Sequence, residues 1–277
     1  MTVRSFRAAT WVAACLIVLP ARGGESVDPQ DVAVAGHDDR AVAMHDKMAA
    51  AMQMDDTALF GKLMLDQLEW RDGRAGEARA AWDVQAWYGG DYNKVWLRTE
   101  GTWIGAPSRG PAGSSGQGVR DGSVDLLWNH AVSPWWSLQA GARQDVGHDP
   151  SRAWAAIGVQ GLAPQWFETE ATLYVRDAGH AAGRLKGQYD LLLTQRLIVQ
   201  PYLEANVYSR SDPSRQLGSG LSDLQASLRL RYEVRREVAP YLGILWMRSF
   251  GGTRERLAAM AVPAGGWQAV VGLRLWF

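Results

Sequence analysis

The chain has 277 residues, with 29 Lys and Arg against 29 Asp and Glu, one Cys, 14 Trp and a mean hydropathy of -0.21. Balanced charge argues against a polybasic nucleic-acid binder, and the hydrophilic average argues against a bundle of membrane helices. A single Cys excludes a disulfide scaffold and metal clusters built on several cysteines. The surplus of Trp over 8 Tyr and 5 Phe remains to be explained.

The N-terminal segment, residues 1–23, has the features of a secretory signal peptide. Arg4 and Arg7 precede an apolar stretch from Ala8 to Pro20, and small residues follow it. The apolar stretch is shorter than the roughly 20 residues that a helix needs to cross a bilayer. We therefore expect export and cleavage, with Cys15 lost in the discarded part.

Residues 24–60 carry no strand pattern and are rich in Ala, Asp, Met and His, which predicts a flexible arm in the periplasm. Thioether sulfur favours Cu(I), and imidazole binds copper in either oxidation state. The arm is therefore a candidate copper site, of low affinity or with several sites. Its candidate ligands are Met44, His45, Met48, Met52, Met54 and His37.

The spacing of three of these methionines has a second interpretation. Met44, Met48 and Met52 are four residues apart, which would align them on one face of a helix. Such a stripe is also typical of the apolar side of a short amphipathic helix. The spacing alone leaves copper binding and helix packing equally open.

From residue 61 onward the sequence alternates with a period of two. Leu224 to Val234 is apolar at every second position over eleven residues, close to the 9 to 11 residues of a tilted strand that crosses a bilayer. Short and long links alternate between such segments, as in outer-membrane barrels. The pattern predicts an all-β fold, a transmembrane antiparallel β-barrel of about 12 strands over residues 61–277. The segments lie near residues 62–71, 79–88, 92–103, 121–131, 135–145, 152–162, 166–176, 184–195, 197–209, 221–234, 239–250 and 266–277.

The last segment and the tryptophans favour an outer-membrane location over a secreted soluble β-protein. Alternate residues from Ala269 to Phe277 form one apolar face that ends on an aromatic residue. Barrel-assembly machinery recognises terminal strands of this kind, so we expect that machinery and outer-membrane lipids as partners. Trp residues near the expected strand ends would form aromatic girdles. They are Trp103, Trp128, Trp135, Trp136, Trp166 and Trp267.

The polar face of each segment would then point into the barrel. It carries eight acids and ten bases, and this balance favours a cross-paired, narrow or partly plugged lumen over an ion-selective pore. The acids are Asp83, Glu100, Asp125, Glu168, Glu170, Asp190, Glu204 and Glu233. The bases are Lys94, Arg98, Arg143, Arg152, Arg176, Arg184, Lys186, Arg229, Arg231 and Arg274.

Several stretches of the chain carry a family resemblance, in the order Leu65–Trp70, Asn93–Gly101, Gly141–Asp145, Gly158–Pro164, Tyr189–Asp190, Leu193–Arg196, Leu228–Glu233, Ala239–Gly243 and Gly272–Phe277. Together they resemble the copper resistance protein B (CopB/PcoB) family of bacterial outer-membrane proteins. The resemblance covers roughly residues 60 to 277 and implies copper handling beside periplasmic copper-resistance proteins. Family members often carry a longer arm with repeated Met/His/Asp units, whereas this arm holds one such cluster.

The sequence therefore predicts a non-enzymatic, copper-binding outer-membrane protein that contributes to copper resistance and homeostasis by sequestration or export. A passive channel or structural barrel without metal specificity is the first alternative. An outer-membrane hydrolase is the second, since His148 and His180 lie near acidic residues in expected outer loops. No Gly-x-Ser-x-Gly nucleophile motif accompanies them.

Overall fold

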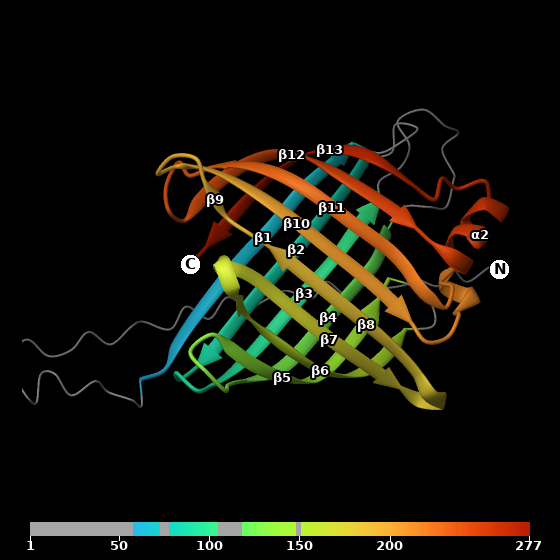
Figure 1. The fold of residues 1–277 in the computed structure, drawn as a ribbon, viewed down its shortest axis with the longest axis horizontal. Coiled ribbons are helices and arrows are strands. Elements are labelled where there is room, and N and C mark those ends of the chain that lie inside the picture. The colour runs from blue at the N-terminus through green and yellow to red at the C-terminus, as the bar shows by residue number, and fades with distance from the viewer. Residues whose placement is uncertain (1–57, 73–77, 105–117, 148–150) are drawn as a thin grey trace, which may run out of the picture. The chain divides into compact units, whose positions relative to one another are not determined.

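The computed structural model describes residues 58–72, 78–104, 118–147 and 151–277. They form one antiparallel sheet of 13 strands that closes on itself, because β1 pairs with β13 and β10 pairs with β11. Figure 1 shows the strongly tilted strands of this barrel. The expected signal peptide, the arm up to residue 57 and His148 lie outside the described residues.

Twelve long strands build the wall, so the predicted barrel and strand number are confirmed. None of the helices in the described part of the chain is long and apolar enough to span a membrane. The strands are β1 (Phe60–Asp72), β2 (Ala78–Gly89), β3 (Asn93–Ile104), β4 (Gly118–Ala131), β5 (Trp136–Val146), β6 (Arg152–Ala163), β7 (Phe167–Arg176), β8 (His180–Gln188), the two-residue β9 (Leu191–Leu192), β10 (Leu197–Tyr208), β11 (Gly220–Tyr232), β12 (Val238–Ser249) and β13 (Gly265–Trp276). The helical elements are η3 (Pro164–Trp166), η4 (Asp177–Gly179), η5 (Pro213–Arg215) and α2 (Gly251–Ala259).

The eighth strand differs from its predicted range of 184–195. Gly179 has a φ of 71° in the turn η4, so the chain reverses at once and β8 begins at His180. His180 therefore starts a strand and does not lie in a long loop. The chain leaves the sheet after Gln188, and β9 resumes pairing with β10 for two residues. The outward side of β8 carries two glycines, which weakens the alternation that predicts a strand.

The two ends of the barrel differ in the length of their connections. At one end, here called the short-turn end, the strands are joined by residues 90–92, 132–135, 164–166, 189–196 and 233–237. At the other, the loop end, residues 209–219 and 250–264 make longer connections, and the latter contains α2. The predicted alternation of short and long links is confirmed for most of the described connections. The exceptions are residues 177–179, a short turn at the loop end, and residues 189–196, a longer connection at the short-turn end.

The first and last strands meet along a β1–β13 seam. Leu63 N donates to the main-chain oxygen of Phe277 at 3.0 Å, and Phe277 N donates to the carbonyl oxygen of Leu63 at 2.8 Å. The seam also contains a bulge, since the register shifts between Leu65 and Leu68. The last residue of the chain is thus hydrogen-bonded into the wall.

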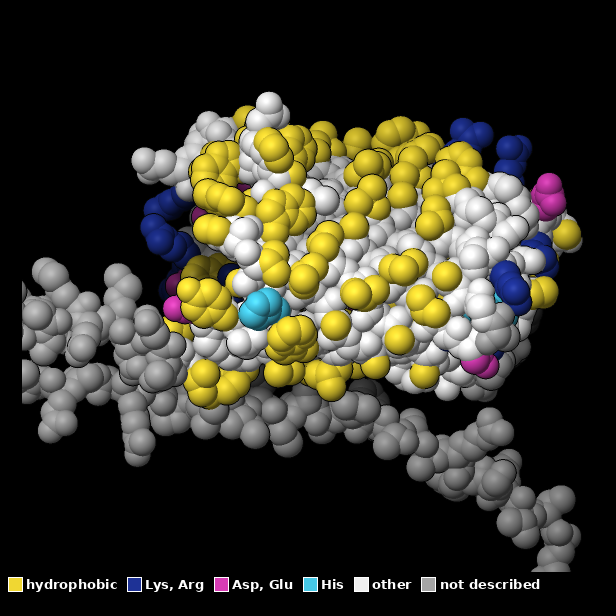
Figure 2. All heavy atoms as spheres, turned by 60° about the horizontal axis from the view of Figure 1, so that its bottom comes forward, with side chains coloured by type: hydrophobic (Ala, Val, Ile, Leu, Met, Phe, Trp, Pro, Cys, Tyr) yellow, Lys and Arg dark blue, Asp and Glu magenta, His cyan; other side chains and the backbone are white. Residues whose placement is uncertain are grey.

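The outer surface of the wall is apolar. Large side chains such as Leu126, Ile157 and Leu242 are exposed there, and Figure 2 shows hydrophobic side chains along the wall with charged side chains gathered at its two ends. This is the reverse of a soluble protein and is typical of a surface that faces lipid. The sequence pattern and the closed sheet together make this a transmembrane barrel.

The predicted aromatic girdle is present at five of its six positions. Trp128, Trp135 and Trp166 are exposed at the short-turn end, where the rings of Trp135 and Trp166 meet edge to face at 5.6 Å. Trp103 and Trp267 are exposed near the loop end. The sixth, Trp136, is half-buried, and Gly161 leaves the space beside its ring. The surplus of Trp noted in the composition thus belongs largely to the wall.

We expect Gly272→Ala to destabilise the barrel. A Cβ at Gly272 would lie 2.4 Å from Tyr241 Cζ and 2.8 Å from the Leu68 carbonyl oxygen, so the added methyl group overpacks the wall beside the seam. Overpacking of this kind costs about 1–3 kcal/mol. Urea unfolding of the protein in lipid vesicles, followed by Trp fluorescence, measures the loss. Gly187→Ala is the control because nothing lies within 4 Å of its added Cβ; equal unfolding midpoints for the two variants would contradict the expectation.

Candidate functional site

The inward face of the barrel is charged, as the sequence predicts. Arg98, Asp125, Arg184, Lys186 and Arg229 are all less than 10 % exposed although each carries a charge. Charges are rarely buried this deeply unless they are paired, because leaving water costs several kcal/mol per ion. The pairs formed here come largely from strands that are not neighbours, so they cross the lumen.

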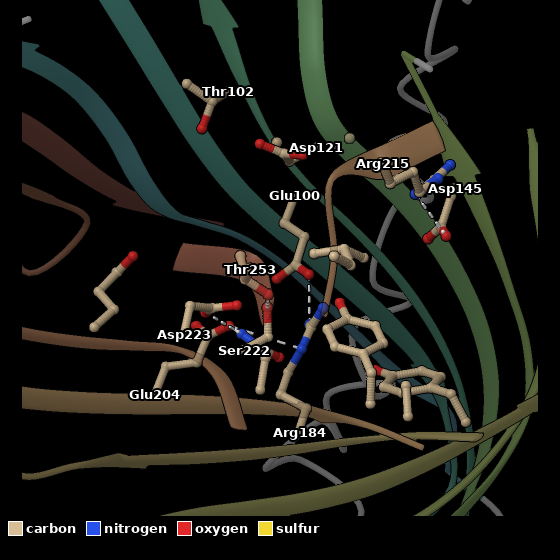
Figure 3. A pocket seen from close by; sticks show the side chains of 18 of the residues that line it. Glu100, Thr102, Asp121, Asp145, Arg184, Glu204, Arg215, Ser222, Asp223 and Thr253 are labelled. Atoms are coloured by element: carbon tan, nitrogen blue, oxygen red, sulfur yellow. Dashed lines mark hydrogen bonds and ion pairs between the residues drawn. The ribbon is translucent and has the colours of Figure 1, made fainter. Parts of the chain in front are cut away.

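Glu100 of β3 is the centre of the largest ion-pair cluster. Its carboxylate pairs with Arg184 and Lys186 of β8, with Lys186 Nζ at 2.8 Å, and with Arg143 of β5 at 3.5 Å. Figure 3 shows Glu100 and Arg184 pointing toward one another inside the barrel. Because β3 and β8 are five places apart in the sheet order, this cluster bridges the interior.

Two further contacts also cross the lumen. Lys186 Nζ lies 3.9 Å from Asp83 Oδ2, and β8 and β2 are on opposite sides of the barrel. Arg98 of β3 donates to Glu170 of β7 at 2.5 Å, and the exposed fractions of these side chains are 3 % and 12 %. The predicted cross-pairing of acids and bases is confirmed.

Glu69 of β1 is a buried acid that the sequence reasoning missed. Arg229 Nε donates to its carboxylate at 2.7 Å, Arg71 Nε at 2.9 Å and the Tyr241 hydroxyl at 3.2 Å. A second register shift, in the pairing of β1 with β2, turns Glu69 inward. The signal was present in the sequence, since the apolar positions change from odd numbers at Leu63 to even numbers at Trp70.

Two cavities occupy the lumen. The loop-end cavity has a volume of about 410 Å³ and is lined by residues that include Glu100, Arg184 and Thr253. The short-turn cavity has a volume of about 180 Å³ and is lined by Lys62, Met64, Asp190, Arg231, Glu233, Arg236, Ala239, Arg274 and Trp276. Among the described residues the two cavities share no lining residue, and the pairs Arg98–Glu170 and Arg229–Glu69 line neither.

The connection 209–219 covers part of the loop-end cavity. Arg215 Nη1 lies 3.0 Å from Asp145 Oδ2, a contact visible in Figure 3, and Asp212 pairs with Arg152 at 2.8 Å. The Thr253 hydroxyl of α2 accepts a hydrogen bond from Gly218 N at 2.7 Å. The loop end of the lumen is thus held by ion pairs between a loop and the rim of the wall.

The acid in this contact titrates at lower pH than usual. Burial alone would raise the pKa of Asp212, but hydrogen bonds from Ser214 and the charge of Arg152 outweigh it, so the pKa lies below its ordinary value of 3.8. A lowered pKa stabilises the docked loop at pH values above 3.8, and this contribution is lost as the pH falls through the lowered pKa.

We therefore expect the loop 209–219 to lose protection in acid. Hydrogen exchange of its amides, corrected for intrinsic rates, should show less protection at pH 3 than at pH 6. In Asp212→Asn, which lacks the titrating group, protection should be low at both pH values. A wild-type loop equally protected at both pH values would refute this role of Asp212.

The ion-pair cluster makes a second prediction. Glu100→Gln removes the charge that three cations share, so we expect the free energy of unfolding to fall by about 3 kcal/mol. Asp177→Asn is the matched control because its carboxylate is 89 % exposed, and such surface changes usually stay within about 0.5 kcal/mol. Urea unfolding in vesicles compares the two. Equal stability of Glu100→Gln and the wild type would show that the cluster does not stabilise the barrel.

The predicted copper ligands are not brought together by the described structure. Met44, His45, Met48, Met52, Met54 and His37 all lie outside the described residues. Within the described ranges no group of three His, Cys, Asp or Glu is arranged to hold a metal ion. The thioethers in those ranges are Met64 in the short-turn cavity, Met247 in the loop-end cavity and the exposed Met260.

The two described histidines do not form the pair that a hydrolase needs. His180 Nδ1 lies 3.2 Å from the Asp177 carbonyl oxygen, which is a backbone atom. His130 Nδ1 lies 2.9 Å from Asn93 Oδ1, and its ring stacks on Trp128. A hydrolase would require an imidazole oriented by a carboxylate next to a nucleophile or water. These contacts lend no support to that alternative.

The sequence of this charged barrel is similar to those of known proteins. Residues 59–277 match the family model described as copper resistance protein B precursor (CopB). Copper resistance protein B of Escherichia coli is 43 % identical over 222 residues, which cover 80 % of this chain and 71 % of that protein. The copper resistance protein B homolog of Pseudomonas syringae pv. tomato is 42 % identical over 225 residues, covering 81 % of this chain and 72 % of its own.

Solved structures agree on the fold. The NanC porin aligns with a TM-score of 0.50 at 9 % identity, over 77 % of this chain and 98 % of the porin. At this identity the likeness concerns the barrel architecture alone.

Proposed function

Because the chain belongs to the copper resistance protein B family, which its relatives connect with copper resistance, we propose that it binds copper through its N-terminal arm and contributes to resistance by sequestration. The transmembrane barrel and the family indicate the outer membrane as its location. In this proposal the short-turn end and the arm face the periplasm, where periplasmic copper-resistance proteins would deliver the ion.

The proposed ligands are the soft donors of the arm, Met44, His45, Met48, Met52 and Met54, with His37 beside them. Methionine suits Cu(I), and histidine suits both oxidation states. The acidic residues among them attract a cation without competing strongly for a soft ion. We expect loose sites of modest affinity that exchange copper, and we expect them to take Cu(I), Cu(II) or both.

The observation that favours sequestration over export is the ion-pair barrier in the lumen. A copper ion would have to pass between Arg98 and Glu170 or beside Arg229 and Glu69, and the two cavities share no lining residue in the described part of the chain. Breaking a buried pair costs about 3–5 kcal/mol. Storage at the arm requires no such opening.

The charge of the short-turn cavity also favours storage. Four cations line it, namely Lys62, Arg231, Arg236 and Arg274, against two carboxylates, those of Asp190 and Glu233. An excess of positive charge at a mouth repels a copper cation. The ion pairs inside the lumen also argue against a passive channel, because a channel would need a continuous water-filled path.

The proposal is tested by copper binding to the full-length protein refolded in detergent. We expect isothermal titration to show Cu(I) or Cu(II) binding that is lost when the six arm residues are changed to Ala. A second variant, with Met64, Met247 and Met260 changed to Leu, removes the described barrel thioethers and should bind copper like the wild type. Loss of binding in the barrel variant, with the arm variant unaffected, would refute the arm as the site.

Measurements of envelope-bound and total cell copper distinguish storage from export. In a copper-sensitive strain lacking its own homologue, the wild-type protein should raise envelope-bound copper and tolerance together, and the arm variant should raise neither. Tolerance accompanied by lower total cell copper would instead indicate export and would refute sequestration.

A further inference from the structure

We propose that the short-turn cavity is a binding site for a small oxyanion, a phosphate or a short carboxylate. The inference depends on the described barrel alone and holds whether or not the arm binds copper. The cavity is formed where β1 and β13 meet at the seam, together with the inward side of β11 and the chain between β8 and β9. It is therefore built from the wall and its turns.

The first observation is the charge of the lining. Four cationic side chains face two carboxylates in a volume of about 180 Å³. One of the cations, Arg236, is exposed at the mouth, and the Lys62 ammonium lies 5.1 Å from the centre of the Trp276 ring. Neither group takes part in an ion pair within the described residues. Their charge remains available to an anion that enters from the solvent.

The second observation is that Arg231 is buried with unused donors. Its side chain is 4 % exposed, and Nη2 lies 2.6 Å from Asp190 Oδ2. Its Nε and Nη1 atoms have no hydrogen-bond partner within the described residues. Buried donors without a partner are costly. Nε and Nη1 each share one edge of the guanidinium with Nη2, so each can donate a separate charge-assisted hydrogen bond to an oxyanion. An anion in the cavity would satisfy the donors that Asp190 leaves free.

Asp190 shows why an additional anion is required. This single carboxylate lies near two guanidinium groups, Arg231 at 2.6 Å and Arg274 at 3.9 Å. Gln200 Nε2 also donates to it at 2.9 Å, and Arg274 has a closer partner in Asp66 at 2.8 Å. Asp190 thus takes only Nη2 of Arg231, and the donors Nε and Nη1 remain without a partner among the described residues.

Size and chemistry limit the ligand to a small oxyanion. At roughly 30 Å³ per water in the liquid, the cavity holds on the order of six waters, which suits phosphate or a short dicarboxylate. An ion with several oxygens can accept from an unpaired donor of Arg231 while another oxygen meets Lys62 or Arg236 at the mouth. A spherical halide cannot make both contacts. The site should therefore distinguish oxyanions from chloride.

The test is isothermal titration of the full-length protein, refolded in a non-ionic detergent, with inorganic phosphate and with succinate. We expect saturable binding of at least one of these probes at a stoichiometry of one, with little competition from an equal concentration of chloride. Phosphate binding in preference to succinate would identify a phosphate site, and the reverse a carboxylate site. No saturable binding of either probe, or equal competition by chloride, would overturn the proposal.

Substitutions in the lining test whether the anion binds in the short-turn cavity. Arg231→Gln should weaken binding by about tenfold, since it removes charged hydrogen bonds. Arg236→Gln, an exposed change that leaves the Asp190 contacts intact, should weaken it by a smaller factor. Asp190→Asn should strengthen binding, because it removes the carboxylate that competes for the same cation. Arg235→Gln, in the same turn but outside the lining, is the control.

The Asp190 variant keeps the test decisive if Arg231→Gln fails to fold. A merely structural Asp190 would weaken binding when replaced, whereas a competing anion gives the opposite sign. Weaker binding in Asp190→Asn, or equal losses in Arg235→Gln and Arg236→Gln, would overturn the assignment.

Discussion

Ion pairs between strands that are not neighbours in the sheet organise the lumen of this barrel. Glu100 obtains its partners from β5 and β8, Glu170 from β3, and Glu69 from β11. Each pair fixes the distance between strands that share no backbone hydrogen bonds. The wall therefore resists changes of cross-section, and its interior is a set of cross-links with two separate spaces.

These cross-links divide the protein into parts with different chemistry. The middle of the lumen presents hard charges that are paired with one another, and the described residues contain only scattered soft donors. A copper ion prefers the opposite, polarisable neutral ligands on a chain that can adapt to it. The proposed roles follow from this difference. In the proposal the barrel anchors the protein in the membrane, and the arm binds the metal.

Much of the fold could be predicted from the sequence because lipid and lumen impose alternate apolar and polar residues on every strand. The prediction failed where that pattern is weak or shifted. β8 has glycines on its outer side, and the register shifts of β1 turn Glu69 inward. The identity of the ion pairs could not be predicted, since Arg98 and Glu170 are 72 residues apart and meet only because of the barrel's closure. The two cavities depend on how side chains pack across the closed barrel, so no pattern in the sequence predicts them.

The hydrogen bonds between Leu63 and Phe277 have a consequence for biosynthesis. The seam joins the first strand of the barrel, β1, to the last, β13, so the sheet cannot close until β13 has been made. Every shorter nascent chain has two open edges, and its inward charges lack the partners that later strands bring. Closure of the barrel is therefore a late step. A chain without β13 would have open edges at β1 and β12 and would not form a smaller barrel.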